Sequence, residues 1–433
     1  MQTNCNMKKI ILTIFGALAA AGTLGATEEL RKNGITGEKV EPEIRIETGT
    51  SGRQVDDTSK DEGSGKTCRR MAVVELSSIY MRQEPDYESA LETQELMGTV
   101  VEIVSESRYW KEIVSPQPYR AWTTEMGLVE MTQEQLKAYM EAPKVMFTGL
   151  YGHVYTAPSL KADTVCDLVG GDILRLYCTT KIHHPKCPGD QILHDQSNSQ
   201  GKTRQDVDSR KYTKGHHCAT GIKLKGRWTK VMLPSGRIGY IPAADLKIHE
   251  GFISIAQGEG SANSIAAETT ERIIAEAQRL MGSPYLWGGM TSKGTDCSGL
   301  VRLCFLKNGI LLPRNASQQL RCGDKVAMET DVRFWEENHR IMTDTTGSGT
   351  KTYTQDFCME MHRRTENLER GDLIFFGNPA KEPGQNPRVT HVGIYLGNGR
   401  FIHSSQVVRI NSLIPGEPDY YENSHRLVGA VRL

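Results

Sequence analysis

The fold of the C-terminal half is decided by one stretch, Thr295-Asp296-Cys297-Ser298-Gly299-Leu300-Val301. A glycine- and aromatic-rich run, Pro284-Tyr285-Leu286-Trp287-Gly288-Gly289, precedes it, and apolar residues follow as far as Phe305. A polar step followed by apolar residues at helical spacing predicts a loop that feeds a buried helix, with Cys297 in its first turn. The free amides and the positive dipole end of a helix start favour thiolate over thiol. Cys297 is therefore a candidate nucleophile.

Two histidines downstream are candidates for the base that a cysteine nucleophile needs. His391 lies in the apolar segment 389–396, and His403 follows the tight-turn signal Gly397-Asn398-Gly399. This pattern predicts a hairpin that brings the two histidines together. We expect His391 to act as general base and His403 to bond its far ring nitrogen, which fixes the tautomer. A lone cysteine or histidine is more often structural, so the prediction depends on the combination.

Several short motifs occur in one order between residues 265 and 433. They are Trp287-Gly288-Gly289, Asp296-Cys297-Ser298-Gly299, Leu312-Pro313-Arg314, Arg370-Gly371-Asp372-Leu373-Ile374-Phe375-Phe376, His391-Val392-Gly393-Ile394-Tyr395 and Phe401-Ile402-His403. Together they resemble the NlpC/p60 family of papain-like cysteine peptidases, which cut bacterial cell-wall peptides. The resemblance implies an α+β, papain-like catalytic domain at residues 262–433. Its catalytic residues are then Cys297, His391 and His403, without a cofactor or a metal.

The resemblance also implies substrate-binding residues around the cysteine. Asp296 and Ser298 face the substrate, and the aspartate helps to hold a terminal ammonium, although it also suits a helix N-cap. Tyr285 either adds a hydroxyl to an oxyanion site formed by backbone amides at Cys297 or Ser298, or is a packed loop aromatic. The remaining substrate-side positions are Trp287, Arg314 and Ser317. Many relatives have a serine two residues after the arginine, where this chain has Ala316, so the contact of the next serine stays open.

Residues 71–132 show short alternating runs at 72–76, 95–104, 110–114 and 120–126, which predict the strands of a small barrel. Met81-Arg82-Gln83-Glu84-Pro85, Tyr109-Trp110-Lys111-Glu112-Ile113 and Tyr119-Arg120-Ala121-Trp122 resemble a bacterial SH3-like domain. The likeness is to the first such domain of NlpC-type enzymes that cleave γ-D-glutamyl-diamino acid bonds. There an acidic residue and a tyrosine surround the free amine of the substrate's L-Ala. By motif position these are Glu95 and Tyr119; otherwise they are a solvated strand residue and a loop aromatic.

Residues 146–247 repeat short sequence motifs of the first barrel in the same order, which predicts a second SH3-like domain. Val154-Tyr155-Thr156-Ala157-Pro158 echoes residues 79–85, and Arg227-Trp228-Thr229-Lys230-Val231 echoes residues 109–113. A polar insert at 178–221 interrupts the repeat and holds Cys178, His183, His184, Cys187, His194, His216, His217 and Cys218. These residues predict either a zinc site or an exported loop stapled by disulfides. We favour disulfides because the spacing lacks a repeated two-residue cysteine pair.

The remaining segments concern location and organisation. At 433 residues the chain exceeds one typical domain. Residues 1–26, with Lys8-Lys9 before an apolar run, have the layout of a secretory signal peptide, and residues 27–70 predict a disordered linker. A second insert at 325–367 forms either a lid or a wall of the predicted catalytic site, or an addition without a role there. The sequence has 52 Lys and Arg residues and 52 Asp and Glu residues, so it has no excess of positive charge that would indicate a nucleic-acid partner.

These patterns predict a cysteine endopeptidase that hydrolyses the γ-D-glutamyl-diamino acid bond of peptidoglycan peptides with a free N-terminal L-Ala. We expect it to be exported, periplasmic or extracellular, with no transmembrane anchor after signal cleavage; the oligomeric state is open. The alternatives are an N-acetylmuramoyl-L-alanine amidase, an acyltransferase on the same scaffold, and a non-catalytic wall-binding protein. The presence of Cys297, His391 and His403 argues against the last.

Overall fold

The computed structural model describes residues 69–177, 226–255, 265–328, 354–382 and 385–433, with Leu224, Phe334, Glu336 and Glu337. All of them belong to one compact unit, Ser51–Leu433. The predicted signal peptide, the linker up to residue 68 and the Cys/His-rich insert lie outside the described residues. The zinc and disulfide alternatives for that insert therefore stay predictions.

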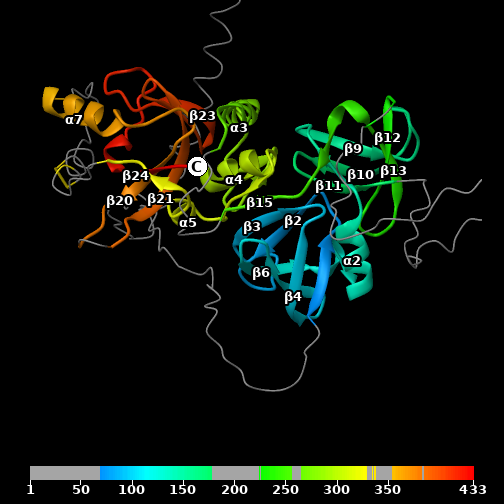
Figure 1. Ribbon diagram of the computed structural model, residues 1–433. Coiled ribbons are helices and arrows are strands. Elements are labelled where there is room, and N and C mark those ends of the chain that lie inside the picture. The colour runs from blue at the N-terminus through cyan, green and yellow to red at the C-terminus, as the bar shows by residue number, and fades with distance from the viewer. Residues whose placement is uncertain are drawn as a thin grey trace, which may run out of the picture. The chain divides into compact units, whose positions relative to one another are not determined.

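The first sheet has seven antiparallel strands in the order β3-β2-β6-β5-β4-β1-β7 (Figure 1). Their bounds are β1 Arg70–Val74, β2 Ser78–Arg82, β3 Leu91–Leu96, β4 Val100–Ser107, β5 Trp110–Ser115, β6 Tyr119–Thr124 and β7 Leu128–Met131. The predicted single strand at 95–104 is wrong, because the chain turns between β3 and β4 at Gly98, with φ of +88°. The sequence analysis also missed β2, β7 and the following helix α2, Gln133–Glu141, which Thr132 caps.

The second sheet repeats the strand order of the first. Its order is β10-β9-β13-β12-β11-β8-β14, which equals that of the first sheet with each strand number raised by seven. The bounds are β8 Lys144–Phe147, β9 Tyr151–Tyr155, β10 Thr164–Val169, β11 Ile173–Leu176, β12 Trp228–Met232, β13 Ile238–Pro242 and β14 Leu246–His249. A 3-10 turn precedes the last strand in both, at η1 Glu125–Gly127 and η2 Ala243–Asp245. An internal repeat predicts this correspondence, whereas the SH3-like classification stays a prediction.

The C-terminal region packs helices on a six-stranded sheet, β19-β24-β20-β21-β22-β23. The bounds are β19 Asp324–Lys325, β20 Leu373–Asn378, β21 Arg388–Gly397, β22 Arg400–Ser405, β23 Val407–Ser412 and β24 Leu427–Arg432, with η3 Ser424–Arg426 before β24. The helices are α3 Ala267–Arg279, α4 Cys297–Leu306, α5 Ala316–Gln319 and α7 Gln355–Thr365. Short strands pair beside them, β15 Ile253–Ser254 with β18 Ile310–Leu311, and β16 Met290–Thr291 with β17 Gly294–Thr295.

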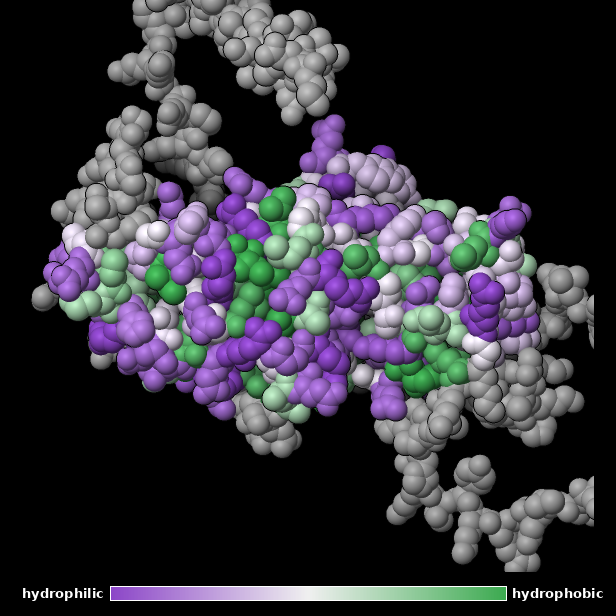
Figure 2. Space-filling model, turned by 90° about the horizontal axis from the view of Figure 1, so that it is seen from above, coloured by the Kyte–Doolittle hydropathy of each residue, from purple (hydrophilic) through white to green (hydrophobic). Residues whose placement is uncertain are grey.

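Helix α4 forms the centre of this region, and every one of its residues is buried. It contacts α3, β21 and β22 (Figure 1), so its nearly all-apolar sequence serves the core. None of the described helices is long and apolar enough to cross a membrane. The face drawn in Figure 2 mixes hydrophilic residues with apolar patches over the described part of the chain.

The predicted hairpin is confirmed, because β21 and β22 pair antiparallel around the turn at residues 397–399. Asn398 in this turn has φ of +52° between two glycines that also have positive φ, which is the backbone that the Gly-Asn-Gly signal favours. Of the second predicted insert, the structure describes its two ends. Helix α7 at the later end buries Phe357 and Met361.

Candidate active site

Cys297 is the first residue of α4, as predicted, and 8% of it is exposed. Its sulfur accepts hydrogen bonds from two backbone amides, those of Ser298 in the same helix and of Val392 in β21. The second contact ties the sulfur to the residue that follows His391 in its strand. Burial and then the charge of Asp296 raise the pKa of the thiol to about 12, while the two amides and a nearby arginine act in the opposite direction. The resting thiol is therefore protonated, and a base has to take its proton.

The two predicted histidines are in direct contact across β21 and β22. His391 Nε2 lies 2.6 Å from His403 Nδ1, with the ring planes at 81°. His403 Nε2 lies 2.8 Å from Oδ1 of Asn411 in β23. The amide nitrogen of Asn411 donates to the carbonyl of Asp419 at 2.6 Å, and this bond orients the amide. Oδ1 of Asn411 therefore accepts the Nε2–H of His403.

This chain of hydrogen bonds sets both tautomers. Because His403 carries its proton on Nε2, its Nδ1 is an acceptor and receives the Nε2–H of His391. His391 Nδ1 is then unprotonated and available to a thiol. Burial lowers the pKa of both imidazoles, that of His403 to about 4, so both are neutral at pH 7. The arrangement provides a base with its free nitrogen determined by the fold.

Sequence analysis missed two residues of this histidine cluster. Asn411 lies eight residues after His403, and its signal is its place opposite the histidine strand in the β22–β23 pairing. Tyr421 stacks on the ring of His391, with centroids 6.0 Å apart and an interplanar angle of 29°. Burial raises the pKa of the Tyr421 hydroxyl, and the charge of Cys297 acts in the same direction. Tyr421 comes from an irregular segment between β23 and β24, where local patterns give no indication of it.

Asp296 is the N-cap of α4 and the centre of a polar cluster. Its Oδ1 accepts the backbone N–H of Gly299 at 2.7 Å, and its Oδ2 accepts that of Gly288 at 2.9 Å. Arg314 donates to both carboxylate oxygens, at 3.0 and 2.5 Å, and to Ser298 Oγ at 2.9 Å. The guanidinium is buried, with 2% of the residue exposed. Three predicted substrate-side residues thus meet, and Arg314 is engaged in holding the other two.

A comparison with known protein families follows the same residues. Residues 282–425 match the NlpC/P60 family. This segment is an NlpC/P60 domain. It contains Cys297, His391, His403 and Asn411, so the histidine chain and the nucleophile all lie within the matched part.

Curated proteins from bacteria match part of the chain. A gamma-D-glutamyl-L-lysine dipeptidyl-peptidase of Bacillus cereus is 27% identical over 194 residues, 45% of this chain and 43% of that protein. A gamma-DL-glutamyl hydrolase of Bacillus subtilis is 31% identical over 153 residues, 35% of this chain and 27% of that protein. The chain spans less than half the length of each of these two relatives. The crystal structure of an NlpC/P60 family protein from Bacillus cereus shares the fold, with a TM-score of 0.53 at 20% identity over 84% of this chain and 99% of that chain.

Three further predicted residues of the NlpC/P60 domain have different surroundings. Tyr285 is near enough to Cys297 that, after burial, the charge of the cysteine raises the pKa of its hydroxyl. Trp287 is 66% exposed, and Ser317 is exposed on α5. The structure thus brings Tyr285 to the nucleophile, whereas Trp287 and Ser317 present their side chains to solvent.

The first sheet reaches this site through Tyr119 at the start of β6. Its hydroxyl donates to Oε2 of Glu92 at 2.7 Å. Burial raises the pKa of Tyr119, followed by the charge of Glu92; Asp296 acts the same way and Arg314 the opposite way. Because the charges of Asp296 and Arg314 act on the Tyr119 hydroxyl, Tyr119 and its partner Glu92 lie near the polar cluster around Asp296. The prediction for Tyr119 thus has support in its position.

Glu95 does not lie beside Tyr119. It is 1% exposed, and its carboxylate pairs with Arg302 of α4 at 3.3 Å. The acidic residue that contacts the tyrosine is Glu92, three positions earlier on β3. Residues three apart in a strand point to opposite faces, so the motif position led to the wrong side of the strand. A buried carboxylate paired with a helix has no surface to offer a ligand.

The loop before the nucleophile approaches β3 closely at Gly288, whose φ is +74°. A Cβ there would lie 2.9 Å from Leu91 Cγ and 3.1 Å from the carbonyl oxygen of Glu92. Only glycine combines this backbone with this clearance. The Trp-Gly-Gly motif therefore has a packing reason in addition to its place near the cysteine.

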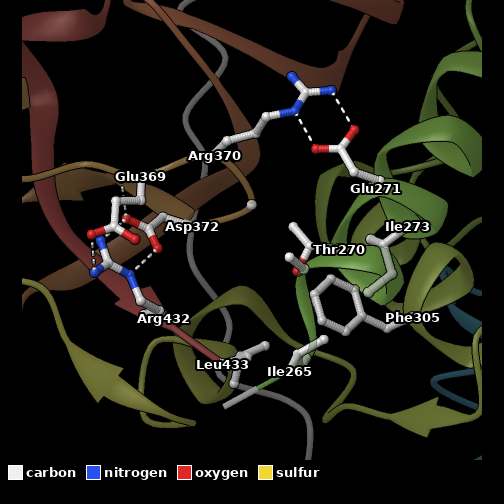
Figure 3. A pocket seen from close by; sticks show the side chains of 12 residues that line it. Ile265, Thr270, Glu271, Ile273, Phe305, Glu369, Arg370, Asp372, Arg432 and Leu433 are labelled. Atoms are coloured by element: carbon white, nitrogen blue, oxygen red, sulfur yellow. Dashed lines mark hydrogen bonds and ion pairs between the residues drawn. The ribbon is translucent and has the colours of Figure 1, made fainter.

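The C-terminal region also has a cavity of about 550 Å³, beside α3 (Figure 3). Apolar side chains such as Phe305 and Ile273 line one side. The charged groups are already paired: Arg370 with Glu271 at 2.6 Å, and Arg432 with Asp372 at 2.8 Å. None of the predicted site residues lines this cavity.

The described residues contain no group of three or more His, Cys, Asp or Glu side chains that could hold a metal ion. The five cysteines in the described part of the chain are free thiols. They are Cys166, Cys297, Cys304, Cys322 and Cys358.

Proposed function

We propose that this protein is a cysteine endopeptidase that hydrolyses the bond between γ-D-glutamate and a diamino acid in bacterial cell-wall peptides. One observation carries the proposal: Cys297 starts a buried helix, and its sulfur accepts the backbone amide of Val392, the residue next to His391, whose Nε2 is bonded to His403. The choice of bond is supported by relatives named gamma-D-glutamyl-L-lysine dipeptidyl-peptidase and gamma-DL-glutamyl hydrolase.

The reaction begins with a proton transfer from Cys297 to His391 Nδ1. The thiolate attacks the γ-carbonyl carbon, and a tetrahedral intermediate forms. The imidazolium then returns the proton to the leaving amine as the C–N bond breaks, which leaves an acyl thioester on the sulfur. A water molecule that gives its proton to His391 hydrolyses the thioester and restores the thiol. The Nε2–H of the imidazolium donates to neutral His403 in each charged step.

The oxyanion of the intermediate needs preorganised donors near the sulfur. The backbone amides at the start of α4 point out of the helix end and lack helical partners. The hydroxyl of Tyr285 is a further donor, because the charge of Cys297 acts on its pKa. We assign these groups to the oxyanion in this proposal.

The substrate's N-terminal ammonium fits the polar cluster on the side of the first sheet. Two carboxylates, Asp296 and Glu92, are accompanied there by one guanidinium, Arg314, so negative charge is in excess. The hydroxyl of Tyr119 donates to Glu92. An ammonium complements this charge, whereas an acylated amine does not. The substrate is then a peptide with a free N-terminal L-Ala.

A digest of two matched peptides tests the proposal. L-Ala-γ-D-Glu-diaminopimelate with a free amine is incubated with the protein, in parallel with its N-acetylated form, and the products are identified by mass spectrometry. We expect release of diaminopimelate from the free peptide alone, and no release by Cys297→Ala. Release of the whole L-Ala-γ-D-Glu-diaminopimelate peptide from its muramoyl form would identify an amidase. Binding of both peptides without cleavage would identify a wall-binding protein.

The proposed substrate is found outside the cytoplasmic membrane, which agrees with the signal-peptide pattern of residues 1–26. We therefore propose export, with peptidoglycan peptides as the partners of the mature protein. Fractionation of cells that express the full chain tests this, and retention of the protein in the cytoplasm would contradict it.

A further inference from the structure

Strand β3 of the first sheet contacts the NlpC/P60 domain with consecutive side chains. Thr93 Oγ1 accepts the Nε–H of Arg314 at 2.6 Å, and Gln94 Oε1 accepts the backbone N–H of Met290 at 2.8 Å. The next residue, Glu95, pairs with α4 as described above. None of the three is more than 2% exposed. A module that only carried the enzyme to its substrate would not need buried polar contacts to the catalytic helix.

Arg314 transmits the contact with Thr93 to both neighbours of the nucleophile. Its Nη1 and Nη2 hold the carboxylate of Asp296, and its Nη1 also holds Ser298 Oγ. A guanidinium is planar and rigid, so fixing the direction of Nε–H fixes the directions of the other donors. Asp296 in turn caps α4 and holds the loop at Gly288. Thr93 therefore lies at the start of a chain of contacts that ends on either side of Cys297.

We infer that Thr93 is a positioning residue: acting through Arg314, it holds Asp296 and Ser298 in the arrangement that keeps Cys297 reactive. The first sheet then maintains the reactivity of Cys297, in addition to forming part of the ammonium site. The inference rests on the proposed function for its substrate, but the reactivity of the thiol can be measured without any substrate.

Loss of the Thr93 hydroxyl has a predictable direction. The Nε–H of Arg314 becomes a buried, charged donor without its acceptor, which is unfavourable, and the guanidinium shifts to find another. Its two bonds to Asp296 then weaken. The carboxylate raises the pKa of Cys297 and Arg314 opposes it, so a looser ion pair leaves the thiol harder to deprotonate. Attack by the sulfur slows, whereas ammonium binding, which Asp296 shares with Glu92 and Tyr119, changes less.

The experiment compares Thr93→Val, which is nearly isosteric, with Thr93→Ser, which keeps the hydroxyl. Thr123→Val, a buried threonine on β6 of the same sheet, is the matched control. We measure kcat and KM on L-Ala-γ-D-Glu-diaminopimelate, and the rate at which iodoacetamide alkylates Cys297 at pH 7, followed on the Cys297 peptide by mass spectrometry. Thermal unfolding reports whether each variant is folded.

For Thr93→Val we expect kcat to fall roughly 10- to 100-fold with KM within about threefold of wild type. Alkylation of Cys297 should slow about tenfold, the change that one unit of thiol pKa produces. Thr93→Ser should restore both rates, and Thr123→Val should leave both unchanged.

Wild-type kcat and alkylation in folded Thr93→Val would overturn the inference. So would a loss that Thr93→Ser shares, because that result indicates a general packing role of β3. If wild type does not cleave the peptide but the alkylation rates follow the expected pattern, the proposed function fails while the positioning role stands.

Discussion

His391 and His403 form a hydrogen-bonded pair, with His391 Nε2 2.6 Å from His403 Nδ1. The pair belongs to neighbouring strands, and a third strand adds Asn411 at 2.8 Å from the far nitrogen of His403. Because Asn411 presents an oxygen, both rings carry their proton on Nε2, which leaves Nδ1 of His391 unprotonated. The unprotonated nitrogen of His391 is thus determined by an amide on the third strand of this series.

Asn411→Leu should lower kcat roughly 100-fold while KM stays near wild type, because the variant removes the acceptor that selects the His403 tautomer. His403 can then hold its proton on Nδ1, which removes the acceptor for His391 Nε2–H. Steady-state kinetics on the free peptide measures the effect. Asn411→Gln, which keeps an amide, is the control, and it should retain more activity than the leucine variant. Equal activity of Asn411→Leu and wild type would show that the tautomer is set by another group.

The activity should persist at more acidic pH than an ordinary histidine base allows. Burial lowers the pKa of His391 well below its ordinary value of 6.5, so the neutral base remains the main form as the pH falls through 6.5. We expect the acid limb of kcat/KM to lie below pH 6.5. A profile from pH 4 to 8 measures it. A half-maximal point at or above pH 6.5 would contradict the lowered pKa.

The same burial makes the folded state sensitive to acid. An unfolded His403 binds a proton near pH 6.5, whereas in the folded protein its pKa is about 4. Its contribution to stability is therefore complete above 6.5 and is lost as the pH falls from 6.5 towards 4, by about 1.4 kcal/mol per pH unit. Urea unfolding at pH 7, 6 and 5 measures the slope. In His403→Gln the free energy of unfolding should depend less steeply on pH. An unchanged pH dependence would assign the effect to other histidines.

The parts of the site that could be predicted from sequence are those with local patterns. The start of α4 followed from a polar step before an apolar run, and the hairpin followed from a Gly-Asn-Gly turn between apolar segments. In each case the residues that decide the structure lie within about ten positions of one another. The candidate cysteine and both candidate histidines were predicted in this way.

Contacts between distant segments could not be predicted in the same way. Thr93 meets Arg314 across 221 positions and Glu95 meets Arg302 across 207, and no local periodicity records such pairs. The surroundings of Glu95 were also hidden by a wrong strand prediction: the turn at Gly98 was read as part of a strand, so the faces of β3 were not assigned. The bond from Glu92 to Tyr119 depends on that assignment.

Glu92→Gln should reduce selectivity for a free N-terminal amine. The variant keeps a partner for the Tyr119 hydroxyl but removes one of the negative charges around the ammonium. We expect kcat/KM on the free peptide to fall roughly 10- to 100-fold, the effect of about 1.5–3 kcal/mol for a hydrogen bond to a charged group. The change should lie mainly in KM. Tyr119→Phe provides a comparison, and a wild-type KM in both variants would contradict the ammonium site.

Glu95→Gln should affect stability rather than substrate binding. Its carboxylate pairs with Arg302, whose side chain is 1% exposed, and two guanidinium nitrogens of Arg302, Nε and Nη1, have no hydrogen-bond partner among the described residues. The variant leaves this guanidinium buried without its countercharge, so we expect the free energy of unfolding to fall by about 3–5 kcal/mol. Urea unfolding gives this value, and KM measured on the folded fraction should equal that of wild type.

The control for this variant is Glu268→Gln, which breaks the exposed pair with Arg272. That change should lower the free energy of unfolding by about 0.5 kcal/mol or less, because water and salt screen the charges. The double variant Glu95→Met with Arg302→Met should recover much of the stability lost in Glu95→Gln, since neither charge is then buried. A raised KM in Glu95→Gln, with stability unchanged, would return Glu95 to the substrate pocket in place of Glu92.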